Sequence, residues 1–301
     1  MRALITGSDG FAGKWLARSL RDDGHEVTGF DIRSGRDVRD YEQVCTAVDE
    51  TEPDLIFHLA ATASPAEALR DPRRATDIIV MGTLNVLEAV RVTGCDARIL
   101  VAGSSDEYGY EDRDPAEVLT EDTVCRPRGP YGAAKLAATA MTMGYVRSCG
   151  LRAVVTRAFM HTGPGRKAVS VTSLFARRIV TVERGEADHV VHGDLGGLVD
   201  LTDVRDVVAA YRAAVMQAPG IWNVCREDLV SLREVMDVLV SLSTAGHVPL
   251  KEDPSLGTRR AANEAQIPRA SAAKLREAAG WEPRIGLETM LGGVLDYWRA
   301  R

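Results

Sequence analysis

Tyr131 and Lys135 are spaced for proton-transfer chemistry, because residues four positions apart lie on one face of a helix. A free tyrosine titrates near pH 10, which is too high for a base at neutral pH. A lysine ammonium beside the phenol favours the phenolate, and a pKa shift of about 3 units corresponds to roughly 4 kcal/mol. We therefore predict that Lys135 lowers the pKa of Tyr131.

A second polar cluster follows the apolar run at residues 98–102. Ligands of parallel α/β proteins bind at the carboxyl ends of the strands. Hydroxyl and carboxyl groups at this position are therefore expected beside a substrate. The cluster reads Gly103-Ser104-Ser105-Asp106-Glu107-Tyr108-Gly109.

Three glycines near the start of the chain predict a phosphate-binding turn. Gly7, Gly10 and Gly13 follow an apolar run at residues 3–5 and open a segment with apolar residues at helical spacing. Gly7 permits the tight turn, Gly10 lets backbone amides approach the phosphates, and Gly13 allows close packing of helix on strand. The positive end of that helix faces the negative charge. We predict that this turn binds a dinucleotide pyrophosphate.

Asp31 closes the next predicted strand, residues 26–31, and lies 24 positions after Gly7. A carboxylate there can accept both hydroxyls of an adenosine ribose, which favours NAD as the cofactor. Arg33 and Arg36 follow closely and could pair with a 2′-phosphate, so NADP stays open. A cationic nicotinamide would also favour the phenolate of Tyr131.

The strand predicted at residues 54–59 ends in Ala60-Ala61, whose small side chains let the backbone lie against the cofactor. His58 lies inside this strand. A lone histidine in a buried strand is more often a hydrogen-bonded core residue, so we assign His58 no chemistry.

Strands and helical segments alternate through the first half of the chain, which indicates a parallel sheet covered by helices. We expect an α/β fold, a Rossmann-type doubly wound parallel sheet with a smaller C-terminal α/β substrate lobe. Residues 1–165 would form the NAD(P)-binding domain and residues 166–301 mainly the substrate lobe. A segment at about 189–225 would return to the first domain.

The second half is predicted in less detail, and one part of it carries several acids. Asp200, Asp203 and Asp206 lie three apart, which predicts a helix that starts near Asp200 with acids in its first turn. Ser231 and Glu234 form a capping box that opens a further helix. Other predicted elements are helices near 80–93, 270–279 and 287–301 and strands at 152–157, 190–194 and 222–224.

Composition excludes several classes of function. The chain of 301 residues carries a net charge of −6, which gives no electrostatic reason to expect a nucleic acid or an anionic membrane as partner. The five cysteines form no C-x-x-C pair, so a disulfide framework, a zinc site or another metal site is not expected. The chain starts on a core strand and has no apolar run long enough to cross a bilayer, so we expect a cytoplasmic protein without a signal peptide.

These motifs together resemble the extended short-chain dehydrogenase/reductase family, also called the NAD-dependent epimerase/dehydratase family. Within it, the chain looks most like the GDP-4-keto-6-deoxymannose reductases and the GDP-mannose 4,6-dehydratases. The residues that carry the resemblance are Thr6–Gly13, Asp31, Asp37-Val38, Leu59-Ala60-Ala61, Ser104–Gly109, Tyr131–Lys135, Gly163–Gly165, Asp200–Asp206 and Gly280–Pro283.

The resemblance implies that a hydride passes between C4 of a sugar and the nicotinamide. Tyr131 would be the acid/base, Lys135 its electrostatic partner and a ribose ligand, and Ser104 a hydrogen-bond partner of the substrate oxygen. Asp106 would take the place of a dehydratase glutamate. Further implied cofactor ligands are Gly7, Gly10, Phe11, Ala12, Gly13, Asp31, Arg33, Asp37, Val38, Leu59, Ala60, Ala61 and Phe159, and implied substrate ligands are Ser105, Met160, His161, Arg259 and Arg260.

Three positions depart from the family pattern. Ile79 and Met160 replace two asparagines, and Val199 replaces an arginine that commonly binds the nucleotide diphosphate. A lost charge-assisted contact to phosphate costs about 1.5–3 kcal/mol unless another group replaces it. The arginines that could replace it are Arg166, Arg177, Arg178, Arg259 and Arg260.

These departures leave three functions open. The first is an NAD(P)-dependent reductase of a keto group on a nucleotide-linked deoxy-sugar. The second is a 4,6-dehydratase or epimerase, which oxidises C4 only transiently and returns the hydride. The third is a reductase of a substrate without a nucleotide. Family members pair through two helices, so we also expect a homodimer through the helices that start near Ile79 and at Tyr131.

Overall fold

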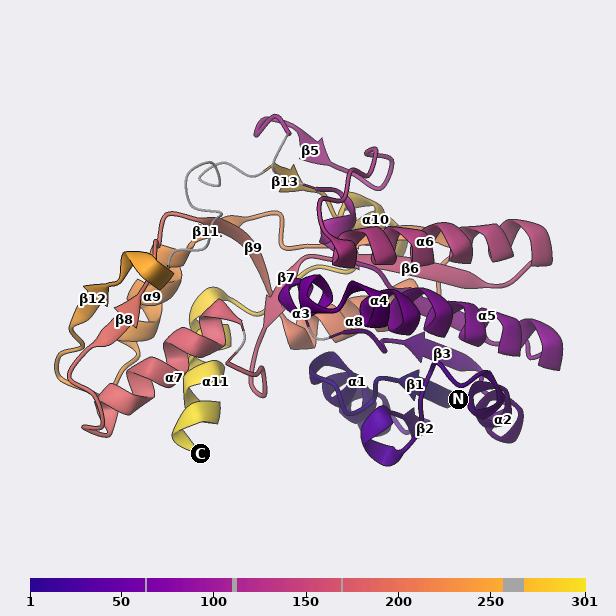
Figure 1. Cartoon of the computed structure of the whole chain (residues 1–301), viewed down its shortest axis with the longest axis horizontal. Helices are drawn as coiled ribbons and strands as arrows, with labels where there is room; N and C mark the ends of the chain where they lie inside the picture. Colours follow the sequence, from indigo (N-terminus) through magenta and orange to yellow (C-terminus); the bar gives the residue numbers. More distant parts are fainter. Residues whose placement is uncertain (63, 110–112, 169, 257–267) are drawn as a thin grey trace.

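The computed structural model describes residues 1–62, 64–109, 113–168, 170–256 and 268–301 (Figure 1). Arg259 and Arg260 lie outside the described residues. Within the described part, no helix is long and apolar enough to cross a membrane.

A six-stranded sheet forms the larger part of the molecule, with the strand order β10-β6-β4-β3-β1-β2. Every neighbouring pair in it is parallel, which confirms the predicted doubly wound α/β fold. β2 lies on one side of β1 and β3 on the other, so the order of the strands reverses between β1 and β3, where ligands of such sheets bind. The strands are β1 (Arg2–Thr6), β2 (Glu26–Phe30), β3 (Leu55–His58), β4 (Arg98–Ala102), β6 (Ala153–Ala158) and β10 (Gly220–Val224).

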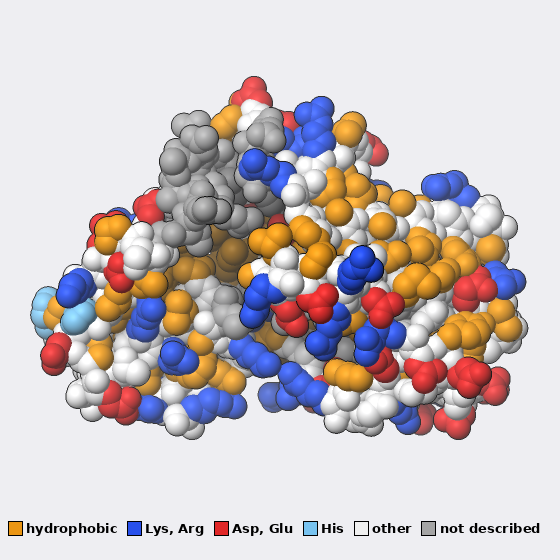
Figure 2. Space-filling model, viewed as in Figure 1, with side chains coloured by type: hydrophobic (Ala, Val, Ile, Leu, Met, Phe, Trp, Pro, Cys, Tyr) orange, Lys and Arg blue, Asp and Glu red, His pale blue; other side chains and the backbone are white. Residues whose placement is uncertain are grey.

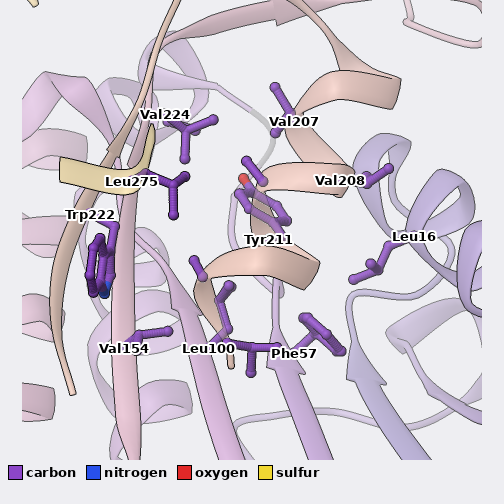
Figure 3. Close-up of a cluster of buried hydrophobic side chains, with 14 of the residues drawn as sticks. Leu16, Phe57, Leu100, Val154, Val207, Val208, Tyr211, Trp222, Val224 and Leu275 are labelled. Carbon is purple, nitrogen blue, oxygen red and sulfur yellow. The ribbon is translucent and has the colours of Figure 1, made fainter. Parts of the chain in front are cut away.

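Helices cover both faces of this sheet, and each face has its own apolar core. On one face, α1 (Phe11–Asp22) and α8 (Val204–Ala214) pack together on the strands. Figure 3 shows Leu16 of α1 and Tyr211 of α8 above Phe57 and Leu100 of the sheet. On the other face, the strands meet α2 (Tyr41–Thr51), α5 (Gly82–Thr93) and α6 (Pro130–Cys149).

The predicted helix near residues 80–93 begins earlier and is not uniform. Two short helices, α3 (Pro65–Arg70) and α4 (Pro72–Thr76), lead into it. A π-helical turn, η2 (Asp77–Met81), then joins α4 to α5. Ile79 lies in this turn and packs against Ala134 and Ala138 of α6. The departure at Ile79 thus places an apolar side chain against the helix that carries Tyr131.

A smaller lobe lies beside the sheet, on the left in Figure 1. Its core joins α7 (Val171–Glu183), α9 (Leu232–Ser241) and α11 (Leu287–Arg299). A three-stranded sheet of β7 (Met160–Thr162), β9 (Leu198–Asp203) and β11 (Leu229–Ser231) lies between the two parts. The remaining elements are β5 (Val118–Leu119), β8 (Val190–His192), β12 (Leu250–Glu252), β13 (Arg269–Ala270), α10 (Ala273–Ala279) and the short turns η1 (Ile32–Ser34), η3 (Ser105–Glu107) and η4 (Pro254–Leu256).

The helix predicted to start near Asp200 is wrong at its beginning. Residues Leu198–Asp203 form β9, which pairs with β7 on one side and β11 on the other. The Asp200 carboxylate accepts hydrogen bonds from the backbone nitrogens of Arg226 and Glu227. Asp203 is the N-cap of α8, so only Asp206 lies in its first turn. The spacing of these acids is typical of a helix start, but Asp200 lies within the strand β9 and Asp203 ends that strand and caps α8.

Two other predictions in this half have mixed outcomes. The capping box at Ser231 and Glu234 is confirmed, because each side chain bonds the other's backbone nitrogen. The helix predicted at 270–279 begins only at Ala273, since Ala270 belongs to β13. β10 pairs with β6 in the large sheet although it follows the lobe strand β9. The domain boundary near residue 165 stays a prediction.

Candidate active site

The turn between β1 and α1 leaves no room for a side chain at its glycines. Gly7 has a φ of +72°, and a Cβ there would lie 2.8 Å from the backbone nitrogen of Ala60. A Cβ at Gly13 would lie 2.2 Å from the Gly7 carbonyl oxygen. Gly10 caps α1 without a side-chain hydrogen bond. The amides of Phe11, Ala12 and Gly13 belong to this first turn, where a helix has no partners for its N–H groups, so an anion fits there.

Asp31 lies directly after β2 and is buried. Its two carboxylate oxygens accept hydrogen bonds from the backbone nitrogens of Asp9 and Arg33, each at 3.0 Å. The Arg33 guanidinium donates to the Asp9 carbonyl at 2.6 Å, and the Arg36 guanidinium carbon is 6.0 Å from the ring centre of Phe30. Carboxylate and guanidinium groups therefore share this end of the sheet, so partners exist for ribose hydroxyls and for a 2′-phosphate.

The other predicted cofactor residues lie in two places, directly after β3 and in the segment before α2. Residues 59–61 follow β3, and a Cβ on Gly7 would meet the backbone of Leu59 and Ala60. Val38 is buried. Asp37 pairs with Arg39 at 2.6 Å, and this hydrogen bond holds the pKa of the Asp37 carboxyl below its usual value. A cofactor role for Asp37 stays a prediction.

The polar cluster after β4 folds into the short turn η3. The Ser104 Oγ accepts a hydrogen bond from the Asp106 backbone nitrogen at 3.1 Å and donates to the Asp106 Oδ2 at 3.2 Å. The Ser104 backbone nitrogen donates to the Glu107 Oε1 at 2.9 Å, which completes a capping box. Ser105 is buried within the turn. The hydroxyl of Ser104 is therefore fixed beside the carboxylate of Asp106.

Tyr131 and Lys135 lie in the first turns of α6, next to η3. A Cβ on Gly132 would lie 2.4 Å from the Asp106 carbonyl oxygen, so helix and turn are in backbone contact. The Lys135 Nζ donates to the Ala102 carbonyl oxygen at 2.7 Å and lies 5.8 Å from the centre of the Tyr131 ring. The structure thus brings Ser104, Asp106, Tyr131 and Lys135 together at the carboxyl end of β4.

Burial sets the charge states of the tyrosine and the lysine. Desolvation raises the pKa of the Tyr131 phenol, and the charge of Asp106 raises it further. Desolvation lowers the pKa of Lys135 to about 8, against the attraction of Glu107. The prediction that Lys135 lowers the pKa of Tyr131 is therefore wrong for the ligand-free protein, because loss of water and a nearby carboxylate decide the direction. Tyr131 holds its proton at neutral pH.

Glu107, which the sequence analysis left without a role, is fully buried beneath these residues. Besides the Ser104 nitrogen, its carboxylate accepts hydrogen bonds from the Thr139 Oγ1 at 3.0 Å and the Arg157 Nε at 2.8 Å. Arg157 lies in β6 and is also buried. The available signal was an arginine inside an apolar strand, since a buried charge requires a partner.

The Arg157 side chain continues this network toward β10. Its Nη1 donates to the Tyr108 hydroxyl and to the Glu121 carbonyl, each at 3.2 Å. The Tyr108 hydroxyl donates to the Asn223 Oδ1 at 2.7 Å. The Asn223 amide in turn donates to the Ser271 carbonyl at 3.1 Å. One buried network therefore joins the turn after β4 to the segment that precedes α10.

The residues after β6 lie between the glycine turn and the smaller lobe. Phe159 is buried, whereas Met160 is 41% exposed. The His161 ring stacks on Phe11, with ring centres 6.0 Å apart, and its Nδ1 lies 3.0 Å from the Phe159 carbonyl oxygen. Burial, together with the charge of Arg166, lowers the pKa of His161 to about 4. The His161 ring thus lies against the start of α1. The substrate role predicted for His161 stays a prediction.

His58 is a core residue, as predicted. Its two ring nitrogens lie 2.7 Å from the Thr6 Oγ1 and 3.1 Å from the Thr83 Oγ1. Burial lowers its pKa to about 3. Among the described residues, no three His, Cys, Asp or Glu side chains are grouped to hold a metal ion.

Comparison with known proteins gives one family. The family described as the NAD dependent epimerase/dehydratase family matches residues 3–225. GDP-6-deoxy-D-mannose reductase of Pseudomonas aeruginosa is 31% identical over 303 residues, with 100% of this chain and 98% of the relative covered. GDP-mannose 4,6-dehydratase of Yersinia enterocolitica is 27% identical, with 96% of this chain and 91% of the relative covered.

Solved structures agree over the whole chain. RMD from Pseudomonas aeruginosa, complexed with NADPH, superposes with a TM-score of 0.89 at 30% identity and covers 100% of this chain and 99% of that one. The UDP-glucose 4-epimerase of Thermus thermophilus, in complex with NAD, has a TM-score of 0.84 at 27% identity and covers 99% of both chains.

The buried ammonium of Lys135 predicts a measurable pH dependence of stability. Below pH 8 both folded and unfolded chains hold this proton, so the cost of burying the charge is fully present. Between pH 8 and 10.5 the unfolded chain holds more protons, so stability rises with pH. Relative to Lys135→Met, the free energy of unfolding should gain about 3 kcal/mol across this window, as measured by urea denaturation.

The matched control is Lys14→Met, which removes an exposed lysine of α1. The free energy of unfolding of the wild type, minus that of Lys135→Met, should become steadily more positive from pH 8 to pH 10.5. If this signed value stays constant or becomes more negative over that window, the buried, charged state of Lys135 is contradicted.

Proposed function

Because the chain belongs to the NAD dependent epimerase/dehydratase family, we propose that it is an NAD(P)-dependent reductase of a keto group on a nucleotide-linked deoxy-sugar. The reductase relative from Pseudomonas aeruginosa is similar over almost its whole length, which supports this activity. The observation that carries the proposal is the assembly of Ser104, Tyr131 and Lys135 at the carboxyl end of β4. The raised pKa of Tyr131 keeps its phenol protonated at neutral pH, so it can donate a proton to a ketone oxygen.

The residues present fit a dinucleotide. Gly7 and Gly13 carry no side chain at the two tightest points of the turn, and α1 begins with a cap that leaves its amides free for a pyrophosphate. Asp31 would accept the ribose hydroxyls of NAD, while Arg33 and Arg36 would hold the 2′-phosphate of NADP. The bound dinucleotide would supply the hydride.

Tyr131, Ser104 and Lys135 would divide the remaining work. Tyr131 would donate its proton to the ketone oxygen, and the Ser104 hydroxyl would hydrogen-bond that oxygen as negative charge develops on it. Ser105 remains the alternative to Ser104. The Lys135 ammonium donates one of its three N–H groups to the Ala102 carbonyl. The other two N–H groups could donate to ribose hydroxyls.

A specific observation favours the dehydratase or epimerase alternative as the second candidate. The Asp106 carboxylate lies at hydrogen-bond distance from Ser104 and interacts with Tyr131, so it could move a proton on the substrate. Dehydratases and epimerases recycle their cofactor, whereas reductases consume it. The third candidate, a substrate without a nucleotide, is supported by Ile79, Met160 and Val199, which place apolar side chains at three family positions.

We also propose a homodimer through α5 and α6. Figure 2 shows hydrophobic side chains gathered over the part of the surface where Figure 1 places these two helices. Ala133, Ala137 and Ala140 of α6 are exposed, and such small side chains permit close helix packing. The five free cysteines support a cytoplasmic location, and the division into residues 1–165 and 166–301 is proposed as the domain boundary.

The dimer predicts twice the mass of one chain in light scattering. Ala137→Arg places a long charged side chain on the proposed interface, so the mass should fall to that of a monomer. Ala300→Arg, an exposed position at the end of α11, should leave the dimer intact. A wild-type protein that scatters as a monomer at micromolar concentration would contradict the proposal.

The reductase activity predicts loss of absorbance at 340 nm when the purified protein is mixed with NADH or NADPH and GDP-4-keto-6-deoxymannose. The cofactor should be consumed in equal amount to the substrate. Tyr131→Phe removes the proton donor and should lower kcat by about 100- to 10,000-fold. Tyr145→Phe, on the same helix but bonded to Glu88, should keep most of the activity.

Three other outcomes would change the assignment. Conversion of a nucleotide sugar with no net consumption of cofactor would favour the dehydratase or epimerase. Turnover only of ketones that lack a nucleotide would favour the third candidate. Oxidation of neither cofactor with any of these keto-sugars would contradict the proposed reductase.

A further inference from the structure

Arg166 is one of the described arginines that could replace the guanidinium missing at residue 199. It follows the Gly163–Gly165 turn, in the loop between β7 and α7. Of the other candidates, Arg177 is exposed and lies over the Trp298 ring. Arg178 donates to the Val191 carbonyl.

The guanidinium of Arg166 is turned inward, toward the glycine turn. Its carbon lies 5.0 Å from the ring centre of Phe11, the first residue of α1. Its electrostatic interactions reach Tyr131 and His161, so it lies on the reactive side of the loop. Its Nε is buried and has no hydrogen-bond partner within the described residues. The backbone of Arg166 is fixed independently, because its carbonyl accepts a hydrogen bond from the Ser173 Oγ at 2.6 Å.

This cation lacks a protein counter-charge in the described part of the chain. No salt bridge joins Arg166 to any described carboxylate, and burial lowers the pKa of its guanidinium. Arg166 as a whole is half-buried, but its Nε is withdrawn from water, which is costly for a charged group that is neither paired nor hydrogen-bonded. His161 cannot supply the counter-charge, because a histidine side chain is either neutral or positive, and this one is neutral near pH 7 since burial lowers its pKa to about 4. The charge of Arg166 is therefore placed for an anion that comes from a ligand.

A second positive feature faces the same place. α1 begins at Phe11, its cap Gly10 offers no side-chain acceptor, and no acid lies in its first turn. The positive end of the helix dipole and the guanidinium therefore meet around Phe11. A group with several anionic oxygens can bond a planar guanidinium with two oxygens while others face the helix amides.

We propose that Arg166 binds the diphosphate of a nucleotide ligand at the N-terminus of α1. The inference rests on the proposed function, which brings two diphosphates to this site. One belongs to the dinucleotide cofactor and the other to the sugar nucleotide. Only in the second case does Arg166 take the place of the guanidinium that the family pattern has at residue 199.

Binding measurements with Arg166→Gln test the proposal and identify the source. NADPH is titrated by its fluorescence, and GDP and guanosine are titrated by calorimetry into the enzyme–NADPH complex. Loss of a charge-assisted contact should weaken the affected diphosphate about 10- to 150-fold. Weaker NADPH binding alone assigns Arg166 to the cofactor, and weaker GDP binding with unchanged guanosine binding assigns it to the sugar nucleotide. Weakening of both places it between them.

Two matched variants guard against trivial effects. Arg177→Gln removes an exposed arginine of α7 and should leave all three titrations within twofold of wild type. Arg166→Lys keeps the charge and should recover part of the lost affinity. The proposal is overturned if Arg166→Gln binds NADPH and GDP within twofold of wild type, or if GDP and guanosine weaken equally.

Failure of the proposed function would look different. A wild-type protein that binds NADPH but leaves keto-sugars unreduced loses the reductase assignment, while the Arg166 titrations still decide the inference. Conversely, an active reductase whose Arg166→Gln variant binds both ligands normally retains its function and loses only the role given to Arg166.

Discussion

The ion pair between Glu107 and Arg157 is the constraint on which the rest of the site depends. Both side chains are buried, and a buried carboxylate costs several kcal/mol unless its oxygens are paired and hydrogen-bonded. Glu107 meets this requirement with three donors from three elements, namely the Ser104 nitrogen, the Thr139 hydroxyl and the Arg157 guanidinium. The turn after β4, the middle of α6 and the end of β6 can satisfy this charge only in one mutual arrangement.

That arrangement places the reactive groups. Because Ser104 is held through its nitrogen, its hydroxyl stays beside Asp106. Because Thr139 is held, the first turn of α6 lies against η3 and carries Tyr131 and Lys135 to the carboxyl end of β4. The cofactor side of the site is fixed differently, by backbone contacts at the glycine turn that exclude side chains. The molecule thus combines a buried charge beside Ser104 and α6 with close backbone contacts at Gly7 and Gly13.

Local rules predicted much of this fold and part of the site. Glycine spacing, apolar runs and the spacing of Tyr131 and Lys135 depend on neighbours in sequence, and they gave the sheet, its helices and the reactive pair. The role of Glu107 was not predictable in that way, because its depth is set by α6 and β6. The charge state of Tyr131 was missed for a related reason, since water is excluded by side chains such as Ile79 that are distant in sequence. At Asp200 the spacing of acids resembled a helix start, whereas pairing with β7 and β11 made a strand.

A double-mutant cycle on Glu107 and Arg157 measures how strongly the folded protein depends on this buried ion pair. The free energy of unfolding is measured in urea for Glu107→Gln, Arg157→Met and the double variant. Each single change should cost about 3–5 kcal/mol, because it leaves a buried charge without its partner, and the double variant should cost clearly less than the sum. The surface pair of half-buried Glu88 and exposed Arg91 is the control, with a coupling energy of at most about 1 kcal/mol. A coupling energy near that of the control, or strictly additive costs, would contradict the account.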